Sequence, residues 1–220
     1  MNMNKKVVST VFFALVTLTM AAQGRLIRID SEDERWWKSS RQMTFARNEL
    51  TRLLMPKDVE FGVVCQPSFS PEWALTYDST THALVYRKAD KSIWHTTYKA
   101  MHKLKKKGNK HSKWVPRKHP KDYVAPNVQA YSLAITDEQL QMLKAIWTNA
   151  VGNAEKKMDA TLDGTSWEYF IDEQRAKARR EDNTLVKFTN ELADAVRTGD
   201  ASRKDTLIDN AFQRGMVNGK

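Results

Sequence analysis

The chain has 220 residues and one cysteine, so it is long enough for a domain with a sizeable core, and an internal disulfide is excluded. Seven tryptophans, eight phenylalanines and six tyrosines supply bulky side chains for that core. The formal net charge of +10 excludes an acidic protein, and most of it lies in one segment.

The first 24 residues predict a secretory leader. They begin with the basic MNMNKK, continue with a fourteen-residue apolar run and end in the small-residue motif AAQG. Cleavage after Gly24 would make Arg25 the first mature residue, and cleavage after Ala21 is the alternative. The apolar run is shorter than the ~20 residues of a membrane span, which favours a cleaved leader over an uncleaved anchor. We therefore expect an exported protein, periplasmic or extracellular, in which residues 25–220 form a single α+β domain with no transmembrane span.

Residues 31–55 predict a helix. Ser31 and Glu34 form a capping box, and Pro56 marks the end of the pattern. The apolar residues that recur at helical spacing are Trp36, Met43, Leu50 and Leu54.

A period of two residues then predicts strands in four segments: 59–65, 73–77, 83–88 and 92–98. In the first segment, the residues expected to share one face are Val59, Phe61, Val63 and Cys65. The short connections indicate an antiparallel meander with one covered face.

The second half of the chain combines strand and helix signals. Thr136 and Gln139 predict a capping box, and Asp163–Gly164 predicts a hairpin that leads into an aromatic strand. The rest of the chain reads as helical, with Asn183 and Ser202 as caps. The predicted fold is α+β, an antiparallel meander sheet with a leading helix and C-terminal helices packed on one face.

The positive charge gathers in a predicted basic loop at residues 99–122. The stretch KLKKKGNKHSKWVPRKHPK, residues 103–121, holds nine lysines or arginines and no acid. Without Lys5 and Lys6 of the leader the chain carries +8, so the mature residues outside this stretch sum to −1. The sequence therefore predicts a nearly neutral domain with one basic segment.

This loop is the candidate binding site, because dense lysine and arginine attract anionic groups with an affinity that falls as salt rises. Trp114, flanked by Tyr98 and Tyr123, could stack on a base or a sugar ring. Three histidines, His102, His111 and His119, would add charge below about pH 6.5. The residues predicted to bind the anion are Lys103, Lys105, Lys106, Lys107, Lys110, Lys113, Trp114, Arg117 and Lys118. Weak incidental adhesion, or a solvated loop without a role, are the alternatives.

The predicted partners follow from charge and export. An anionic polysaccharide, a phosphorylated lipid or a membrane surface is preferred, and a protein partner is a further option. Nucleic acid ranks below these, because an exported chain leaves the compartment that holds it. The sequence calls for no cofactor and no metal.

Cysteine and histidine chemistry has little support in the sequence. Cys65 could act as a nucleophile with His82 or His95 as its base, but its strand pattern predicts a small buried side chain. The histidines His95, His102, His111 and His119 are spaced by six to eight residues, without a pair at metal-binding spacing or a second cysteine.

Carboxylates could serve glycoside hydrolysis if two of them converged. Those on or beside predicted strands are Glu72, Asp78, Asp163 and Glu168. Asp78 and Asp163 lie in predicted turns, and Glu168 alternates with aromatic neighbours and is expected to face water.

The leader, with its Asn/Lys start and AAQG end, resembles those of exported proteins from Bacteroidetes-type bacteria. The order helix, LDGTSWEYF, helix over residues 136–197 is similar to small exported proteins of unknown function from that group. The resemblance implies export and no catalytic residues. We therefore expect an exported, non-enzymatic binding or interaction protein; the alternatives are a hydrolase with an unrecognised site, and a subunit that binds a protein through its aromatic sheet face.

Overall fold

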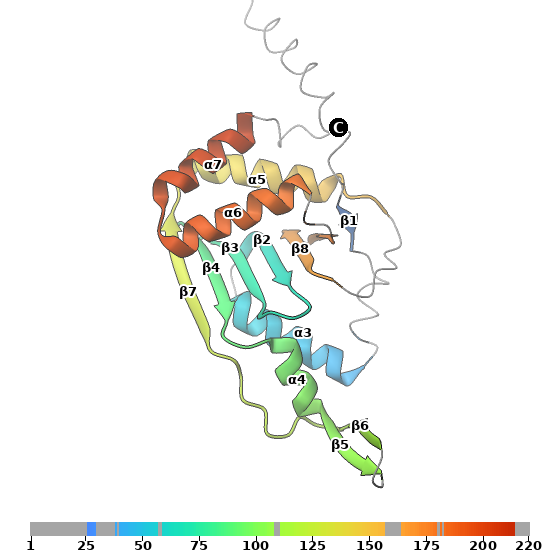
Figure 1. Ribbon diagram of the computed structural model, residues 1–220. Helices are drawn as coiled ribbons and strands as arrows, with labels where there is room; N and C mark the ends of the chain where they lie inside the picture. Colours follow the sequence, from blue (N-terminus) through green and yellow to red (C-terminus); the bar gives the residue numbers. More distant parts are fainter. Residues whose placement is uncertain are drawn as a thin grey trace, which may run out of the picture.

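The computed structural model describes residues 26–29, 38, 40–56, 59–107, 111–156, 164–179, 181 and 183–213 (Figure 1). For residues 104–113 it describes the backbone of the two strands only. The predicted leader, the capping box of Ser31 and Glu34, and the Asp163 hairpin turn lie outside these residues, as does Lys110.

The described part of the chain contains a seven-stranded antiparallel sheet flanked by helices, which confirms the α+β class. The strand order is β1-β9-β8-β2-β3-β4-β7. The strands are β1 (Ile27–Arg28), β2 (Val59–Gln66), β3 (Trp73–Asp78), β4 (Ala83–Ala89), β7 (Val128–Ala134), β8 (Ser166–Ile171) and β9 (Gln174–Ala178). The helices are α3 (Arg41–Leu54), α4 (Ile93–Met101), α5 (Asp137–Gly152), α6 (Thr184–Thr198) and α7 (Ala201–Gln213).

Helices cover both faces of the sheet, so the expectation of one covered face is wrong. Helices α5, α6 and α7 lie on one side, as predicted for the C-terminal helices, and α3 and α4 lie on the other (Figure 1). A large core cluster fills the first side, and a smaller one around Leu54, Val64 and Phe170 fills the second. Residues on both faces of the central strands are therefore buried.

Helix α3 begins later than the helix predicted for residues 31–55. Ser40 has extended backbone dihedrals, and its hydroxyl accepts a hydrogen bond from the Met43 N–H at 3.2 Å, so α3 begins at Arg41. This local cap interrupts the predicted helix of residues 31–55. The end of the helix at Leu54, just before Pro56, is as predicted.

A register shift in β2 separates Val59 from the face on which it was predicted. The shift lies between Val59 and Gly62, and Val59 packs against the smaller cluster while Phe61, Val63 and Cys65 join the larger one. Gly62 is required at this point, because a Cβ there would lie 2.5 Å from the carbonyl oxygen of Leu75.

The fourth predicted strand, residues 92–98, is wrong, because this segment forms helix α4. The Ser92 hydroxyl accepts from the His95 N–H at 3.1 Å. The buried Glu72 carboxylate accepts from the N–H groups of Ile93 at 2.7 Å and Trp94 at 3.0 Å. This carboxylate satisfies the first amides of the helix and overrides the strand preference of β-branched residues such as Ile93.

In the second half, the capping box of Thr136 and Gln139 and the cap of Asn183 are confirmed. Ser202 is not the cap of α7; the Asp200 carboxylate accepts from the Arg203 N–H at 2.9 Å and takes that role. Strand β9 differs from the prediction, because the sequence pattern favours a helix over residues 174–178.

Candidate anion-binding arm

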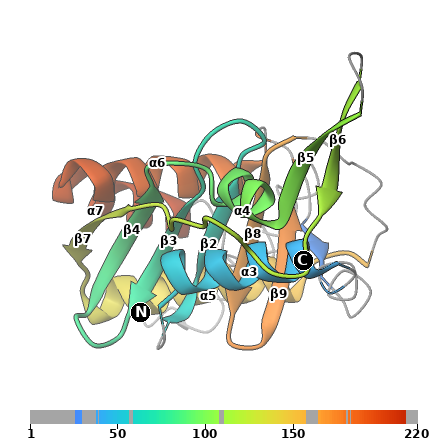
Figure 2. The same cartoon turned by 90° about the horizontal axis from the view of Figure 1, so that it is seen from below.

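The predicted basic loop contains regular structure. Strands β5 (His102–Lys107) and β6 (His111–Pro116) pair as a two-stranded antiparallel ribbon, which we call the arm. The arm starts directly after α4 and projects away from the seven-stranded sheet (Figures 1 and 2). Residues 99–122 therefore do not form a loop throughout, and the structure presents the basic residues on a strand framework.

The register of the arm separates lysine from aromatic positions. Successive residues of a strand alternate between its two faces. The register pairs Lys105 with Lys113 and Lys107 with His111, so these positions share one face with Lys103. We call positions 103, 105, 107, 111 and 113 the lysine face. The opposite face carries the pair of Leu104 and Trp114, together with His102 and Lys106, and we call it the aromatic face.

Aromatic stacking joins the base of the arm to helix α4. The rings of Tyr98 and His102 stack with centroids 4.1 Å apart, and Trp114 meets Tyr98 edge-on at 5.7 Å. Tyr98 and His102 are four residues apart, so both lie on the same side of the helix end. Trp114 therefore faces α4, on the side of the arm opposite the lysine face.

Main-chain bonds complete this attachment. The Arg117 N–H donates to the Met101 carbonyl at 2.6 Å, and its guanidinium donates to the His102 carbonyl at 3.2 Å. The Lys121 N–H donates to the Ala100 carbonyl at 3.1 Å. These bonds fasten the exit of the arm to the end of α4, so the arm has a defined root.

The charge of the arm is uncompensated within its own sequence. No acid occurs from Lys99 to Lys121. Like charges directly opposite each other on paired strands are destabilising, and the register places Lys105 opposite Lys113. A bound polyanion would offset this repulsion, so binding and ordering of the arm should favour each other.

The structure separates the predicted binding residues into groups. Lys103 is exposed on the lysine face, and Trp114 is 43% exposed at the root of the arm. Lys106 lies on the opposite face, and Lys118 is exposed beyond the ribbon. Arg117 has a positioning role through its bond to His102.

Tyr123, predicted to flank Trp114, does not lie with the arm. Its ring packs against Phe45 at 5.0 Å, and its hydroxyl donates to the Glu49 carboxylate at 2.7 Å. Burial and the Glu49 carboxylate raise the pKa of Tyr123, so this hydroxyl stays protonated as a donor. The residue attaches the segment after the arm to α3. The stacking of Tyr98 on His102 was not predicted, because residues 92–98 were expected to form a strand and not a helix.

The alternative nucleophile, Cys65, is buried on β2 with 2% of its surface exposed. Burial raises the pKa of its thiol, and no histidine is among the described residues that line the cleft beside it. His82 contacts Tyr77, and His95 lies on the exposed side of α4. This environment suits a structural cysteine.

The described carboxylates suggested for acid-base chemistry are engaged in structural bonds. Glu72 caps α4, and Asp78 accepts from the N–H groups of Thr80 and Thr81 in a turn. Glu168 was expected to face water, and this is wrong: it is 4% exposed and bonded to Arg47 and Arg175. The sheet face that carries Glu168 is covered by α3, which explains its burial.

Among the described residues, no group of three histidine, cysteine, aspartate or glutamate side chains could hold a metal ion. Within the same residues, no helix combines the length and apolar character needed to cross a membrane. No protein-family model, curated protein or solved structure matches the chain.

Proposed function

We propose that this protein is an exported, non-enzymatic binding protein whose lysine face contacts an anionic polymer of the cell envelope. The observation that carries the proposal is the two-faced arm. Its register gathers four lysines and a histidine on one face, while the aromatic face is seated against α4. The predicted leader, and the resemblance of residues 136–197 to exported proteins, support an envelope partner over an intracellular one.

The structure offers less support for the alternative functions. Helices cover both faces of the central strands, which leaves only part of the aromatic sheet face, such as Tyr131 on the edge strand β7, open to a protein partner. Glu72, Asp78 and Glu168 are each bonded to structural donors, so no two of these three carboxylates are free for catalysis. Nucleic acid remains a relevant comparison, because a two-stranded ribbon can enter the major groove of DNA.

Changing Lys105, Lys107 and Lys113 together to glutamine should weaken binding to heparin and to anionic vesicles by roughly 100-fold. Each lysine near an anionic surface contributes about 1 kcal/mol, and three such contacts exceed the 2.8 kcal/mol, about twice 1.4, that corresponds to 100-fold. The slope of log affinity against log salt should fall by about two to three. Titrations across a salt series measure both quantities.

The matched control changes Lys91, Lys156 and Lys187 to glutamine. These lysines are exposed and lie outside the arm, and their replacement removes the same total charge. This variant should bind nearly as wild type. An equal loss of affinity in both variants would show that binding depends only on net charge and would contradict the proposal. Much tighter binding to duplex DNA than to heparin at the same salt would overturn the envelope partner.

A further inference from the structure

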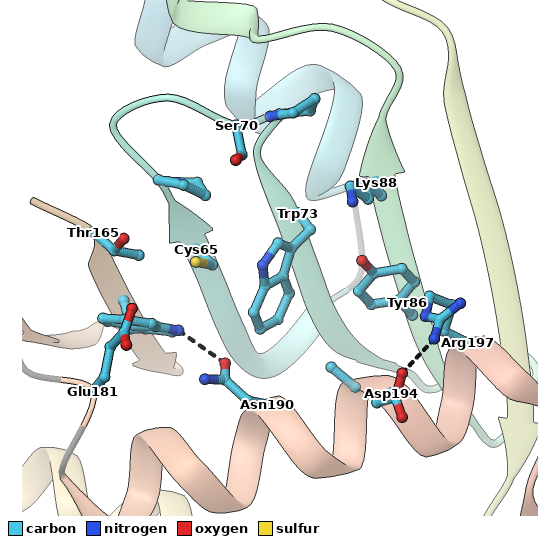
Figure 3. Close-up of a pocket in the computed structure, with 14 residues that line it drawn as sticks. Cys65, Ser70, Trp73, Tyr86, Lys88, Thr165, Glu181, Asn190, Asp194 and Arg197 are labelled. Carbon is cyan, nitrogen blue, oxygen red and sulfur yellow. Dashed lines mark hydrogen bonds and ion pairs between the residues drawn. The ribbon is translucent and has the colours of Figure 1, made fainter.

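A second candidate site shares no residue with the arm. A cleft of about 430 Å³ opens where the β2–β3 connection, β4, β8 and helix α6 meet (Figure 3). Small-molecule sites usually have volumes of about 300–1,000 Å³. Aromatic rings from three strands line it: Trp73, Tyr86 and Trp167. The centroids of Trp73 and Tyr86 are 5.7 Å apart and the ring planes are tilted by 39°, so the two rings form adjacent, angled parts of one aromatic wall.

Tyr86 places an unpaired hydroxyl in this cleft. The residue is 6% exposed, and its hydroxyl points into the hollow (Figure 3). Within the described part of the chain this hydroxyl makes no hydrogen bond. Burial raises the pKa of Tyr86 to about 12, so the group is a neutral donor at pH 7. This hydroxyl is therefore free to donate to a ligand oxygen in the cleft.

Asn190 offers further donors beside the aromatic wall. The Trp167 indole N–H donates to the Asn190 amide oxygen at 3.0 Å, which fixes the orientation of the carboxamide. Its amide nitrogen has no hydrogen-bond partner among the described residues. Lys88 and Ser70 line the same cleft and are exposed. The cleft therefore joins flat apolar surfaces with several separate polar groups.

The charges around the cleft cancel, in contrast to those of the arm. Lys88 and Arg197 line it together with Glu181 and Asp194. Asp194 forms an exposed ion pair with Arg197, so the charges of these two lining residues offset each other (Figure 3). The lining therefore favours a ligand without net charge.

We propose that this cleft binds a neutral saccharide unit. A sugar ring presents an apolar face of C–H groups, which suits the partly exposed ring of Trp73, and a rim of hydroxyl groups, which can accept and donate hydrogen bonds. The Tyr86 hydroxyl and the Asn190 amide would bind that rim. The proposal does not depend on the function of the arm, since it uses no residue of the arm.

The test is titration of the purified protein with cellobiose, maltose and N,N′-diacetylchitobiose, followed by saturation-transfer NMR. We expect at least one of these disaccharides to bind with a dissociation constant of about 1 mM or tighter. Trp73→Ala should weaken that binding by tenfold or more. Tyr86→Phe removes only the hydroxyl and should weaken it by about 2- to 10-fold, the value of one hydrogen bond.

Tyr131→Phe is the control, because Tyr131 lies on the neighbouring strand β7, outside the lining of the cleft. It should bind as wild type, and so should the triple lysine variant of the arm. The inference is overturned if none of the three disaccharides binds, or if Tyr86→Phe and Trp73→Ala both bind as wild type. If the arm variant loses heparin binding but still binds the disaccharide, the two sites bind their ligands independently.

Discussion

Replacing Glu168 with alanine should lower the free energy of unfolding by about 3–5 kcal/mol, the usual cost of breaking a buried ion pair from one side. Glu168 is 4% exposed and accepts from Arg47 at 2.6 Å and from Arg175 at 2.7 Å. The alanine variant leaves both guanidinium groups without their shared carboxylate. Urea denaturation followed by tryptophan fluorescence measures the loss.

The control for this prediction is Asp194→Ala, which removes the carboxylate of an exposed pair with Arg203. That change should cost less than about 1 kcal/mol. If Glu168→Ala were as mild as the control, the ion pairs of Glu168 would not stabilise the fold.

The same carboxylate should make stability depend on acid pH. Burial alone would raise the pKa of Glu168, but Arg47 and Arg175 together hold this pKa below its usual value. A folded-state pKa below the unfolded value of about 4.3 gives stability that is present above that pH. This contribution is lost as the pH falls through the folded-state pKa. Wild type should therefore lose stability more steeply below about pH 4.3 than Glu168→Gln does.

The second large effect is expected at Trp147, whose replacement with alanine should cost about 3–5 kcal/mol. Trp147 extends from α5 into the larger core cluster, is 1% exposed, and packs against Phe61 and Tyr169 with centroids 5.4 Å and 6.1 Å away. Its indole N–H donates to the Gly62 carbonyl at 2.8 Å. The loss combines lost burial with an empty volume between helix and sheet, and chemical denaturation measures it.

Trp147→Phe separates the two contributions. It retains an aromatic ring but removes the bond to the Gly62 carbonyl, so it should cost about 1–3 kcal/mol. A loss in Trp147→Phe equal to that in Trp147→Ala would show that packing of the ring contributes little, contrary to its burial.

Local signals predicted much of this fold. The caps at Thr136 and Asn183 and the shared face of Phe61, Val63 and Cys65 depend only on neighbouring residues, and the structure confirms them. Predictions failed where a residue far away in the sequence determines the local structure or burial. Helix α4 depends on the carboxylate of Glu72, 21 residues before Ile93, and Glu168 is buried by Arg47, 121 residues away. A single sequence carries no sign of either pairing.

For the candidate sites too, local features were predictable from the sequence and contacts between distant residues were not. The density of lysine after Tyr98 is plain in the sequence, so the location of the arm was predictable. The separation into a lysine face and an aromatic face was not, because it depends on the register that pairs Leu104 with Trp114. The cleft joins Trp73, Tyr86 and Asn190 from separate elements, and no spacing along the chain connects them.

The most direct test of the arm as the binding surface is amide hydrogen exchange with and without a heparin oligosaccharide. At low salt, bound oligosaccharide should slow exchange in residues 102–116, and about 0.5 M salt should abolish the effect, since the screening length there falls below about 8 Å. Helices α6 and α7 should exchange at unchanged rates. Binding of the oligosaccharide with unchanged exchange in the arm, or with protection only on another surface, would contradict the proposed function.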